Sequence, residues 1–186
     1  MKLTGHCWTY GDDVNTDVIF PGKYTYTMTN IADFKKVALE DLDPEFAKHV
    51  QAGDIIVAGK NFGCGSSREQ AAVCLKMCGV KVIVAKSFAR IFFRNCVNNG
   101  VLPIVCPEAV NAIQKGDEIT VDLERNEISF AAAPKPTRHS PLVTFAFPPL
   151  SPSVTAIIDA GGLIPMLRKK LGTEHLPMPE IKFAGE

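Results

Sequence analysis

The chain has 186 residues, of which 46% are hydrophobic and 22% charged, a balance typical of a soluble globular protein with room for a sound core. Its 20 basic and 20 acidic residues cancel, so the charge gives no reason to expect a nucleic-acid or anionic-membrane partner. The first residues lack the apolar stretch of a secretory signal, and no apolar run approaches membrane-spanning length. We therefore expect a cytoplasmic protein.

The six cysteines show no spacing of a metal or redox motif, which favours buried free thiols and no metal bound by this chain. They are Cys7, Cys64, Cys74, Cys78, Cys96 and Cys106. Cys64 differs because it follows a glycine, close to the expected start of a helix and to Arg68, where a thiolate is favoured. A cysteine nucleophile therefore remains an alternative.

The first third of the chain gives weak signals. Residues 3–10 are expected to form a strand, and the turn-forming, aspartate-rich segment Gly11–Asp17 follows. Residues 23–30 are polar and aromatic without a helical period, which indicates a loop. Residues 33–50 have a helical composition that is interrupted near Pro44.

From residue 54 the pattern is clear. Buried apolar runs at 54–58, 80–85 and 101–105 alternate with helical segments at 67–78 and 88–99. Such alternation predicts a parallel βαβαβ core covered by helices, and therefore an α/β fold.

A second pattern follows residue 116. Alternating apolar residues on either side of a turn at 125–126 predict a β-hairpin added to the core. Residues 131–153 hold six prolines and indicate an irregular excursion. Residues 154–171 are expected to be helical, with the tail 172–186 extended. We expect a single domain over residues 1–171.

The most informative stretch is Gly59–Gln70, which links the strand at 54–58 to the helix at 67–78. Ser66 with Glu69 forms a capping-box pattern that predicts a helix start at the serines. A helix start offers backbone N–H groups to an anion, and Ser66, Ser67 and Arg68 add two hydroxyls and a guanidinium. These features predict a carboxylate or phosphate site. The alternative is a helix cap with glycines that serve only a tight turn.

The spacing in this loop excludes two named phosphate loops. No lysine follows the last glycine as a P-loop requires, and Arg68 stands where a dinucleotide fingerprint needs its third glycine. Ligand sites of parallel sheets lie at the carboxyl ends of the strands, so Lys86 and Ser87, which follow the strand at 80–85, are expected on the same edge. For these two and Arg90 we favour capping and ion pairs over catalysis.

Four segments together resemble one family. They are Gly11–Asp17, Ala58–Glu69, Ala85–Asn95 and Ala160–Leu163. In residue types, order and spacing the chain resembles the small subunits of 3-isopropylmalate dehydratase, the swivelling domain of aconitase-type hydro-lyases. The resemblance implies a β/β/α sandwich.

The resemblance also implies an activity and a partner. Family members dehydrate a hydroxy-diacid and rehydrate it at the neighbouring carbon, here in leucine biosynthesis. They do so at a [4Fe–4S] cluster held by a large subunit in a heterodimer or heterotetramer, with no cofactor on the small chain. By resemblance Ser66 is the general base, and Gly65, Ser67 and Arg68 bind a substrate carboxylate. Thr16 and Asp17 match a pair that borders the site, and by the same resemblance they are expected to take part in substrate binding.

Residue chemistry alone does not predict the base, because an unassisted serine hydroxyl loses its proton only far above neutral pH. Helix amides, an arginine and a nearby metal cluster are needed to offset that cost.

Substrate choice in the family is made by the loop that here reads Tyr24, Thr25, Tyr26, Thr27 and Met28. Isopropylmalate enzymes carry aliphatic residues after the tyrosine, and homocitrate enzymes carry an arginine at the position of Tyr26. The absence of that arginine disfavours a third carboxylate, whereas Tyr26 and Met28 suit a branched alkyl group. A related dehydratase acting on 2,3-dimethylmalate or another substituted malate remains open, as does a non-catalytic anion-binding module.

Overall fold

The structure is a computed structural model that describes residues 1–131 and 141–177. Its strands form one seven-stranded sheet in the order β4-β3-β2-β1-β5-β6-β7. The strands are β1 (Lys2–Tyr10), β2 (Ile55–Ala58), β3 (Val82–Ala85), β4 (Leu102–Val105), β5 (Glu118–Asp122), β6 (Glu127–Ala131) and β7 (Leu142–Ala146). The helices are α1 (Thr16–Ile19), α2 (Phe46–His49), α3 (Glu69–Met77), α4 (Arg90–Asn98), α5 (Pro107–Ala112), α6 (Pro152–Asp159) and α7 (Leu163–Leu171), with 3-10 turns η1 (Gly22–Tyr24) and η2 (Ile31–Lys36).

Strand β1 joins two halves of the sheet. Its second half, from Cys7 to Tyr10, pairs in parallel with β2, which pairs in parallel with β3 and then β4. Its first half, from Lys2 to His6, pairs antiparallel with β5, which forms a hairpin with β6. Both the predicted parallel βαβαβ core and the predicted hairpin are confirmed.

The side chains of the parallel strands alternate between two cores. In β2, Ile56 and Ala58 belong to the core under α3 and α4, which also contains Phe62 and Phe92. Ile55 and Val57 belong to the core on the opposite face.

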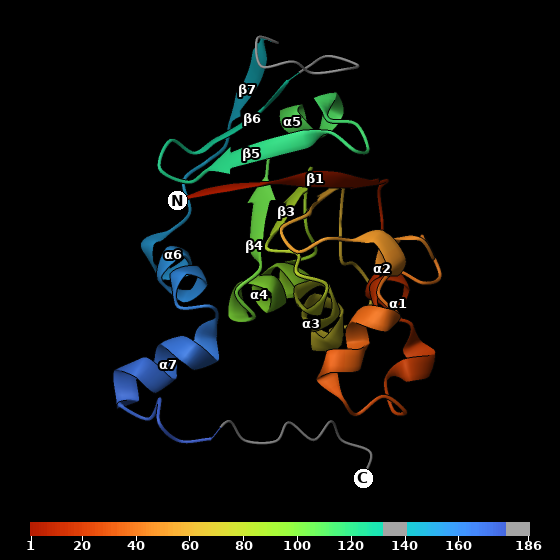
Figure 1. Cartoon of the computed structure of the whole chain (residues 1–186), viewed down its shortest axis with the longest axis vertical. Coiled ribbons are helices and arrows are strands. Elements are labelled where there is room, and N and C mark those ends of the chain that lie inside the picture. Colours follow the sequence, from red (N-terminus) through yellow and green to blue (C-terminus); the bar gives the residue numbers. More distant parts are fainter. Residues whose placement is uncertain (132–140, 178–186) are drawn as a thin grey trace.

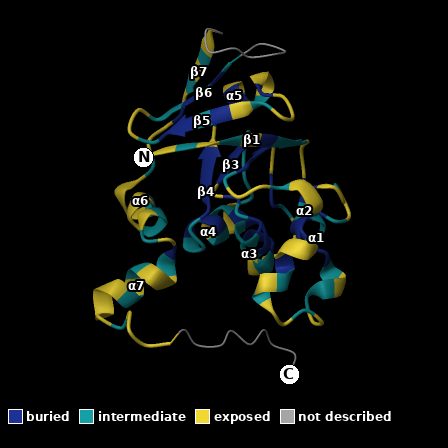
Figure 2. Cartoon of the chain, in the orientation of Figure 1, coloured by how far each residue is buried: buried dark blue, intermediate teal, exposed yellow. Residues whose placement is uncertain are grey.

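The second core is shared by the two halves of the sheet. Beside the residues of β2–β4 it contains Ile119 and Val121 of β5 and Ile128 and Phe130 of β6. Figure 1 shows β5–β7 on one side of the parallel strands and α3 and α4 on the other, and Figure 2 shows how fully β3 and β4 are buried. The predicted β/β/α sandwich is therefore confirmed.

The expectation of an irregular excursion over residues 131–153 is wrong in part. Residues 142–146 form β7, which pairs antiparallel with β6, and the ring of Phe145 stacks on Phe130 with centroids 6.2 Å apart. The prolines at 141, 148 and 149 flank this strand rather than interrupt it, so its ladder keeps its donors. Residues 132–140 lie outside the described part of the chain.

The helical expectation for residues 33–50 is wrong over most of its length. The chain forms the 3-10 turn η2 and only the four-residue helix α2. Leu39 has a φ of +57°, a left-handed conformation that stops a helix, and its N–H donates to the Ile19 carbonyl at 3.0 Å.

The C-terminal region forms two helices rather than one. Gly161 and Gly162, with φ of +82° and +129°, separate α6 from α7, and neither helix has a buried residue. Residues 172–177 make turns, and the rest of the tail that we expect to be extended, 178–186, lies outside the described residues. Within the described chain no helix is both long and apolar enough to cross a membrane.

Candidate functional site

The glycine-rich loop after β2 is held by backbone hydrogen bonds to the segment before α1. The Gly63 N–H donates to the Val14 carbonyl and the Thr16 N–H to the Cys64 carbonyl, both at 2.8 Å, as in a short parallel ladder. Gly63 has a φ of +77°, and a Cβ there would lie 2.1 Å from Cγ of the buried Phe92. Only glycine fits this position, because the loop backbone rests directly on a core ring.

The predicted capping box is wrong. Helix α3 begins at Glu69, its N-cap is Arg68, and no side chain accepts from its first N–H groups. The Arg68 N–H donates to the Ser66 carbonyl at 2.8 Å, closing a tight turn that leaves both serines before the helix. The Glu69 carboxylate instead accepts from Asn99 Nδ2 at 3.0 Å. The Ser66 hydroxyl is therefore not spent on a cap.

The turn before α3 presents free hydrogen-bonding groups. Gly65, Ser66 and Ser67 are exposed, and within the described residues their backbone N–H groups and both hydroxyls have no protein hydrogen-bond partner. They stand at the N-terminus of a nine-residue helix, where the dipole is positive. This arrangement suits a carboxylate or phosphate, as the sequence predicts.

Three predicted residues are joined to this turn. The Thr16 hydroxyl, which is buried, donates to the Ser66 carbonyl at 2.9 Å, and a Cβ on Gly65 would lie 3.5 Å from Thr16 Oγ1. The Asp17 carboxylate forms an ion pair with Nη1 of Arg68. The Arg68 side chain is 24% exposed, and its Nη1 is buried with Asp17 as its ion-pair partner.

The segment Tyr24–Met28, called the specificity segment because the resemblance predicts that it selects the substrate, follows a glycine that lies against the same arginine. A Cβ on Gly22 would lie 3.1 Å from Arg68 Nη1. Beyond it, Tyr24 and Met28 are half-buried against the core under α3, whereas the Tyr26 side chain is 79% exposed. Tyr26 is therefore the one large side chain of this segment that projects, while Met28 does not.

The two loop ends of the sheet edge meet as predicted. The Asn61 N–H donates to the Ser87 hydroxyl at 2.8 Å, and the Lys86 N–H donates to the Ala58 carbonyl at 3.2 Å. Ser87 therefore joins the loops instead of capping α4, whose N-cap is Ala89. We favoured ion pairs of these residues with the partner subunit or with Asp residues. Among the described residues neither Lys86 nor Arg90 pairs with an Asp, and the pairing with a partner subunit stays a prediction.

The cysteines are buried free thiols, with the exception of Cys64. Burial raises the pKa of the Cys78 thiol to about 12, and burial raises the pKa of the Cys74 and Cys96 thiols as well. Cys64 is partly exposed, and its thiol donates to the Asp13 carbonyl at 3.4 Å.

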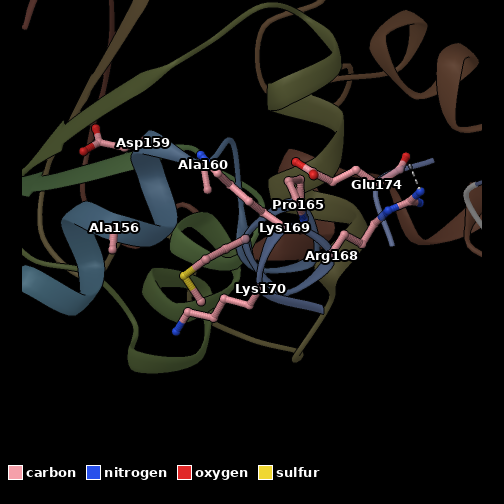
Figure 3. A pocket seen from close by; sticks show the side chains of 9 residues that line it. Ala156, Asp159, Ala160, Pro165, Arg168, Lys169, Lys170 and Glu174 are labelled. Atoms are coloured by element: carbon pink, nitrogen blue, oxygen red, sulfur yellow. Dashed lines mark hydrogen bonds between the residues drawn. The ribbon is translucent and has the colours of Figure 1, made fainter. Parts of the chain in front are cut away.

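No group of three or more His, Cys, Asp or Glu side chains that could hold a metal ion occurs in residues 1–131 and 141–177. A hollow of about 710 Å³ lies beside α6 and α7 and contains none of the predicted site residues. Figure 3 shows Arg168 and Glu174 at this hollow, where Arg168 Nη2 donates to the Glu174 carbonyl at 3.0 Å. The candidate anion site is a turn on the surface rather than a cavity.

A parallel sheet with a glycine turn, two free serines and an arginine at the start of a helix defines a class of protein. Residues 12–109 match the family described as the aconitase C-terminal domain. The fold agrees, since the crystal structure of 3-isopropylmalate dehydratase from Methanocaldococcus jannaschii superposes with a TM-score of 0.83 at 39% identity, covering 94% of this chain and 98% of that one.

Relatives narrow the class to one family. The 3-isopropylmalate dehydratase small subunit of Moorella thermoacetica is 44% identical over 93% of this chain and 99% of its own length. That of Aquifex aeolicus is 47% identical over 94% of this chain and 99% of its own length. The chain therefore belongs to the family of 3-isopropylmalate dehydratase small subunits, which are subunits of hydro-lyases.

The sequence missed one residue next to the site. Glu40 accepts from Tyr24 Oη and from Lys23 Nζ, both at 2.9 Å. No motif marks a lone glutamate in a turn, so only the coordinates bring it to the specificity segment.

Proposed function

We propose that this chain completes the active site of a two-subunit hydro-lyase that interconverts 2-isopropylmalate and 3-isopropylmalate in leucine biosynthesis. The family supports the reaction, and the free Ser66 hydroxyl beside Arg68 is the observation that carries the proposal. In the isolated chain Ser66 is exposed and the Arg68 side chain is partly exposed, so a partner and a substrate can reach this turn.

Ser66 is the general base of the proposed reaction. Its oxygen takes the proton from the carbon next to a substrate carboxylate, while the hydroxyl leaves from the neighbouring carbon. The alkoxide that this step needs is stabilised by the amides of Gly65 and Ser67 and by the dipole of α3. The Ser66 carbonyl accepts hydrogen bonds from the Arg68 N–H and from the Thr16 hydroxyl, which fixes the backbone of Ser66. The Ser66 hydroxyl takes no part in these bonds and stays available to the substrate.

Arg68 binds a substrate carboxylate, with the Ser67 hydroxyl and the Gly65 amide at the same anion. Asp17 orients the guanidinium through the ion pair and leaves its other donors to the substrate. Thr16 is too buried to touch a ligand, so we assign it the positioning of Ser66 rather than a contact.

The cluster and its cysteines belong to the large subunit in this proposal. A cluster needs several thiolates close together, and the described residues contain no group of three or more His, Cys, Asp or Glu side chains that could hold a metal ion. The cluster, when bound by the partner, supplies a Lewis acid for the departing hydroxyl. Six free thiols suit the reducing cytoplasm, where we place the complex.

The segment Tyr24–Met28 is proposed to face the substrate's alkyl group. Tyr26 projects from it, and it lacks a cation for a third carboxylate. A related malate with a smaller branched substituent, such as 2,3-dimethylmalate, is the second candidate, because Thr25 replaces the aliphatic residue expected for isopropylmalate.

Turnover of the anaerobically mixed large and small subunits on isopropylmalate, 2,3-dimethylmalate, citraconate and homocitrate tests the proposal. We expect each subunit alone to be inactive and the mixture to prefer isopropylmalate. Preference for dimethylmalate would keep the mechanism and change the substrate. A stable complex that turns over none of them would favour a non-catalytic anion-binding module.

Cys64→Ser separates the serine base from a cysteine nucleophile. The serine mechanism predicts that the variant keeps its turnover, because the Cys64 thiol only donates to a carbonyl. Loss of turnover in a variant that still assembles would support the cysteine.

A further inference from the structure

The specificity segment is fastened to the rest of the chain at one carboxylate. Tyr24 Oη donates to Oε2 of Glu40 and Lys23 Nζ donates to Oε1, each at 2.9 Å. Lys23 Nζ also lies 3.5 Å from Oδ1 of Asp41 and 5.0 Å from the centroid of the Tyr24 ring. Both oxygens of Glu40 are therefore engaged, one by Tyr24, the first residue of the segment, and one by Lys23, which precedes it.

Glu40 is itself fixed to the helix that carries two site residues. The preceding residue, Leu39, is fully buried, and its N–H donates to the carbonyl of Ile19 at 3.0 Å. Ile19 ends α1, and α1 begins with Thr16 and Asp17. The backbone that presents Glu40 therefore cannot shift without disturbing α1.

The chain just before the segment approaches Arg68 of the candidate anion site. Gly22 precedes Lys23 and lies so close to Arg68 that a Cβ on it would be 3.1 Å from Nη1 and 3.3 Å from Nη2. The Gly22 carbonyl accepts from Thr25 N–H at 3.1 Å, and Thr27 Oγ1 donates to the Lys23 carbonyl at 3.1 Å. A shift at Lys23 and Tyr24 therefore carries through the turn to Tyr26.

We propose that Glu40 is a positioning residue that sets the distance between the Tyr24–Met28 segment and Arg68, and thereby the size of the substituent accepted beside the bound carboxylate. This inference rests on the proposed function. The Tyr24 hydroxyl is occupied by Glu40, so Tyr24 acts through the placement of Tyr26 and not by a contact of its hydroxyl with substrate.

Because the ion pair between Lys23 and Glu40 is partly exposed, its loss should change the position of the segment and not the stability of the whole chain. The side chains of Lys23 and Glu40 are 53% and 35% exposed, so their ion pair contributes little to the stability of the whole chain. Its loss frees a segment of a few residues that has only turn-type backbone bonds of its own. The expected effect is therefore local, on the segment and on the substrate group that it meets.

Glu45 offers a matched control. Its two oxygens also each contact a side chain, Lys48 Nζ at 2.6 Å and His49 Nε2 at 3.1 Å, and its own side chain is 56% exposed. It stands at the start of α2 and makes no hydrogen bond or ion pair with the specificity segment among the described residues. Glu45→Ala removes an equivalent surface network and leaves the segment alone.

The first test measures substrate preference in the reconstituted enzyme with 3-isopropylmalate and 3-methylmalate. We expect Glu40→Ala to raise KM for isopropylmalate about tenfold, with a much smaller change in kcat and in KM for methylmalate. Glu40→Gln, whose amide oxygen still accepts from Tyr24, should recover part of the effect, and Glu45→Ala should show none. An unchanged ratio of kcat/KM between the two substrates in Glu40→Ala would overturn the inference.

Hydrogen exchange of the full chain without partner gives a readout that does not need activity. We expect amides 24–28 to exchange about tenfold faster in Glu40→Ala and at the wild-type rate in Glu45→Ala, with α3 and β2 unchanged in both. Unchanged exchange at 24–28 would refute the positioning role by itself. Faster exchange together with an inactive wild-type complex would refute the proposed function and leave the fastening by Glu40 standing.

Discussion

Two loops meet at Arg68, and they are held in different ways. The turn that carries Ser66 is fixed by backbone bonds from Gly63 to Val14 and from Thr16 to Cys64, and it rests on a buried ring. The segment Tyr24–Met28 is fixed by half-exposed side chains, chiefly Glu40. Backbone bonds do not depend on which side chains are present, whereas the side-chain network does. In this account the chemistry is built into the fold, and the substrate preference is open to change by substitution.

The largest expected effect is on the chemistry itself. Ser66→Ala removes the proposed base while the backbone bonds of the turn remain, so kcat should fall about 10³-fold. Assembly with the large subunit and KM should change little. Ser67→Ala is the comparison variant: it removes the neighbouring exposed hydroxyl that we assign to the substrate carboxylate, so it should raise KM and leave most of kcat. Equal losses in both variants would mean that neither serine is the base.

A substitution at Gly63 should disrupt the turn that carries Ser66 most strongly. Gly63→Ala places a methyl 2.1 Å from the Phe92 ring at a φ of +77°, which should lower the free energy of unfolding by about 3 kcal/mol in urea denaturation. Gly116→Ala isolates the backbone strain, because Gly116 has a φ of +90° and no atom near its Cβ position. If both variants lost the same stability, contact with Phe92 would not hold the turn.

Arg68→Lys keeps a charge beside Asp17 but loses the planar fork. We expect KM for the diacid to rise about 30-fold, near 2 kcal/mol of binding, with a smaller effect on kcat. Arg94→Lys, on the exposed face of α4, should match the wild type. A kcat loss as large as that of Ser66→Ala, without a rise in KM, would assign Arg68 a role in the chemical step.

The smallest expected effect concerns the specificity segment, Tyr24–Met28. Thr25 Oγ1 is buried without a hydrogen-bond partner in the described residues, so Thr25→Val should raise the free energy of unfolding by up to about 1 kcal/mol. Thr27→Val loses the bond from Thr27 Oγ1 to the Lys23 carbonyl and should be slightly destabilising. Destabilisation by Thr25→Val would show that its hydroxyl has a partner.

The predictability of the two loops from sequence differs for the same physical reason. Buried apolar runs and the glycines that end α3 and α4 are local signals, so the parallel core and the place of the glycine turn follow from the sequence. The helix start at Glu69 does not follow, because the competing bond from Arg68 N–H to Ser66 depends on the approach of Val14 and Thr16.

Other features were not predictable because they depend on contacts between distant segments. Strand β7 is specified by its pairing with β6, not by its proline-flanked sequence. The turn at Leu39, which breaks the expected helix, depends on the bond to Ile19. The same turn presents Glu40, so the sequence could not predict that Glu40 binds Tyr24 of the specificity segment.

The most direct test of the central claim follows the carbon-bound hydrogen. Reconstituted enzyme is incubated in light water with 3-isopropylmalate deuterated at carbon 3, and the label remaining in recovered substrate is measured. We predict that wild type and, at saturating substrate, Arg68→Lys lose deuterium, while Ser66→Ala retains it. Loss of deuterium at the wild-type rate in Ser66→Ala would contradict the assignment of Ser66 as the base.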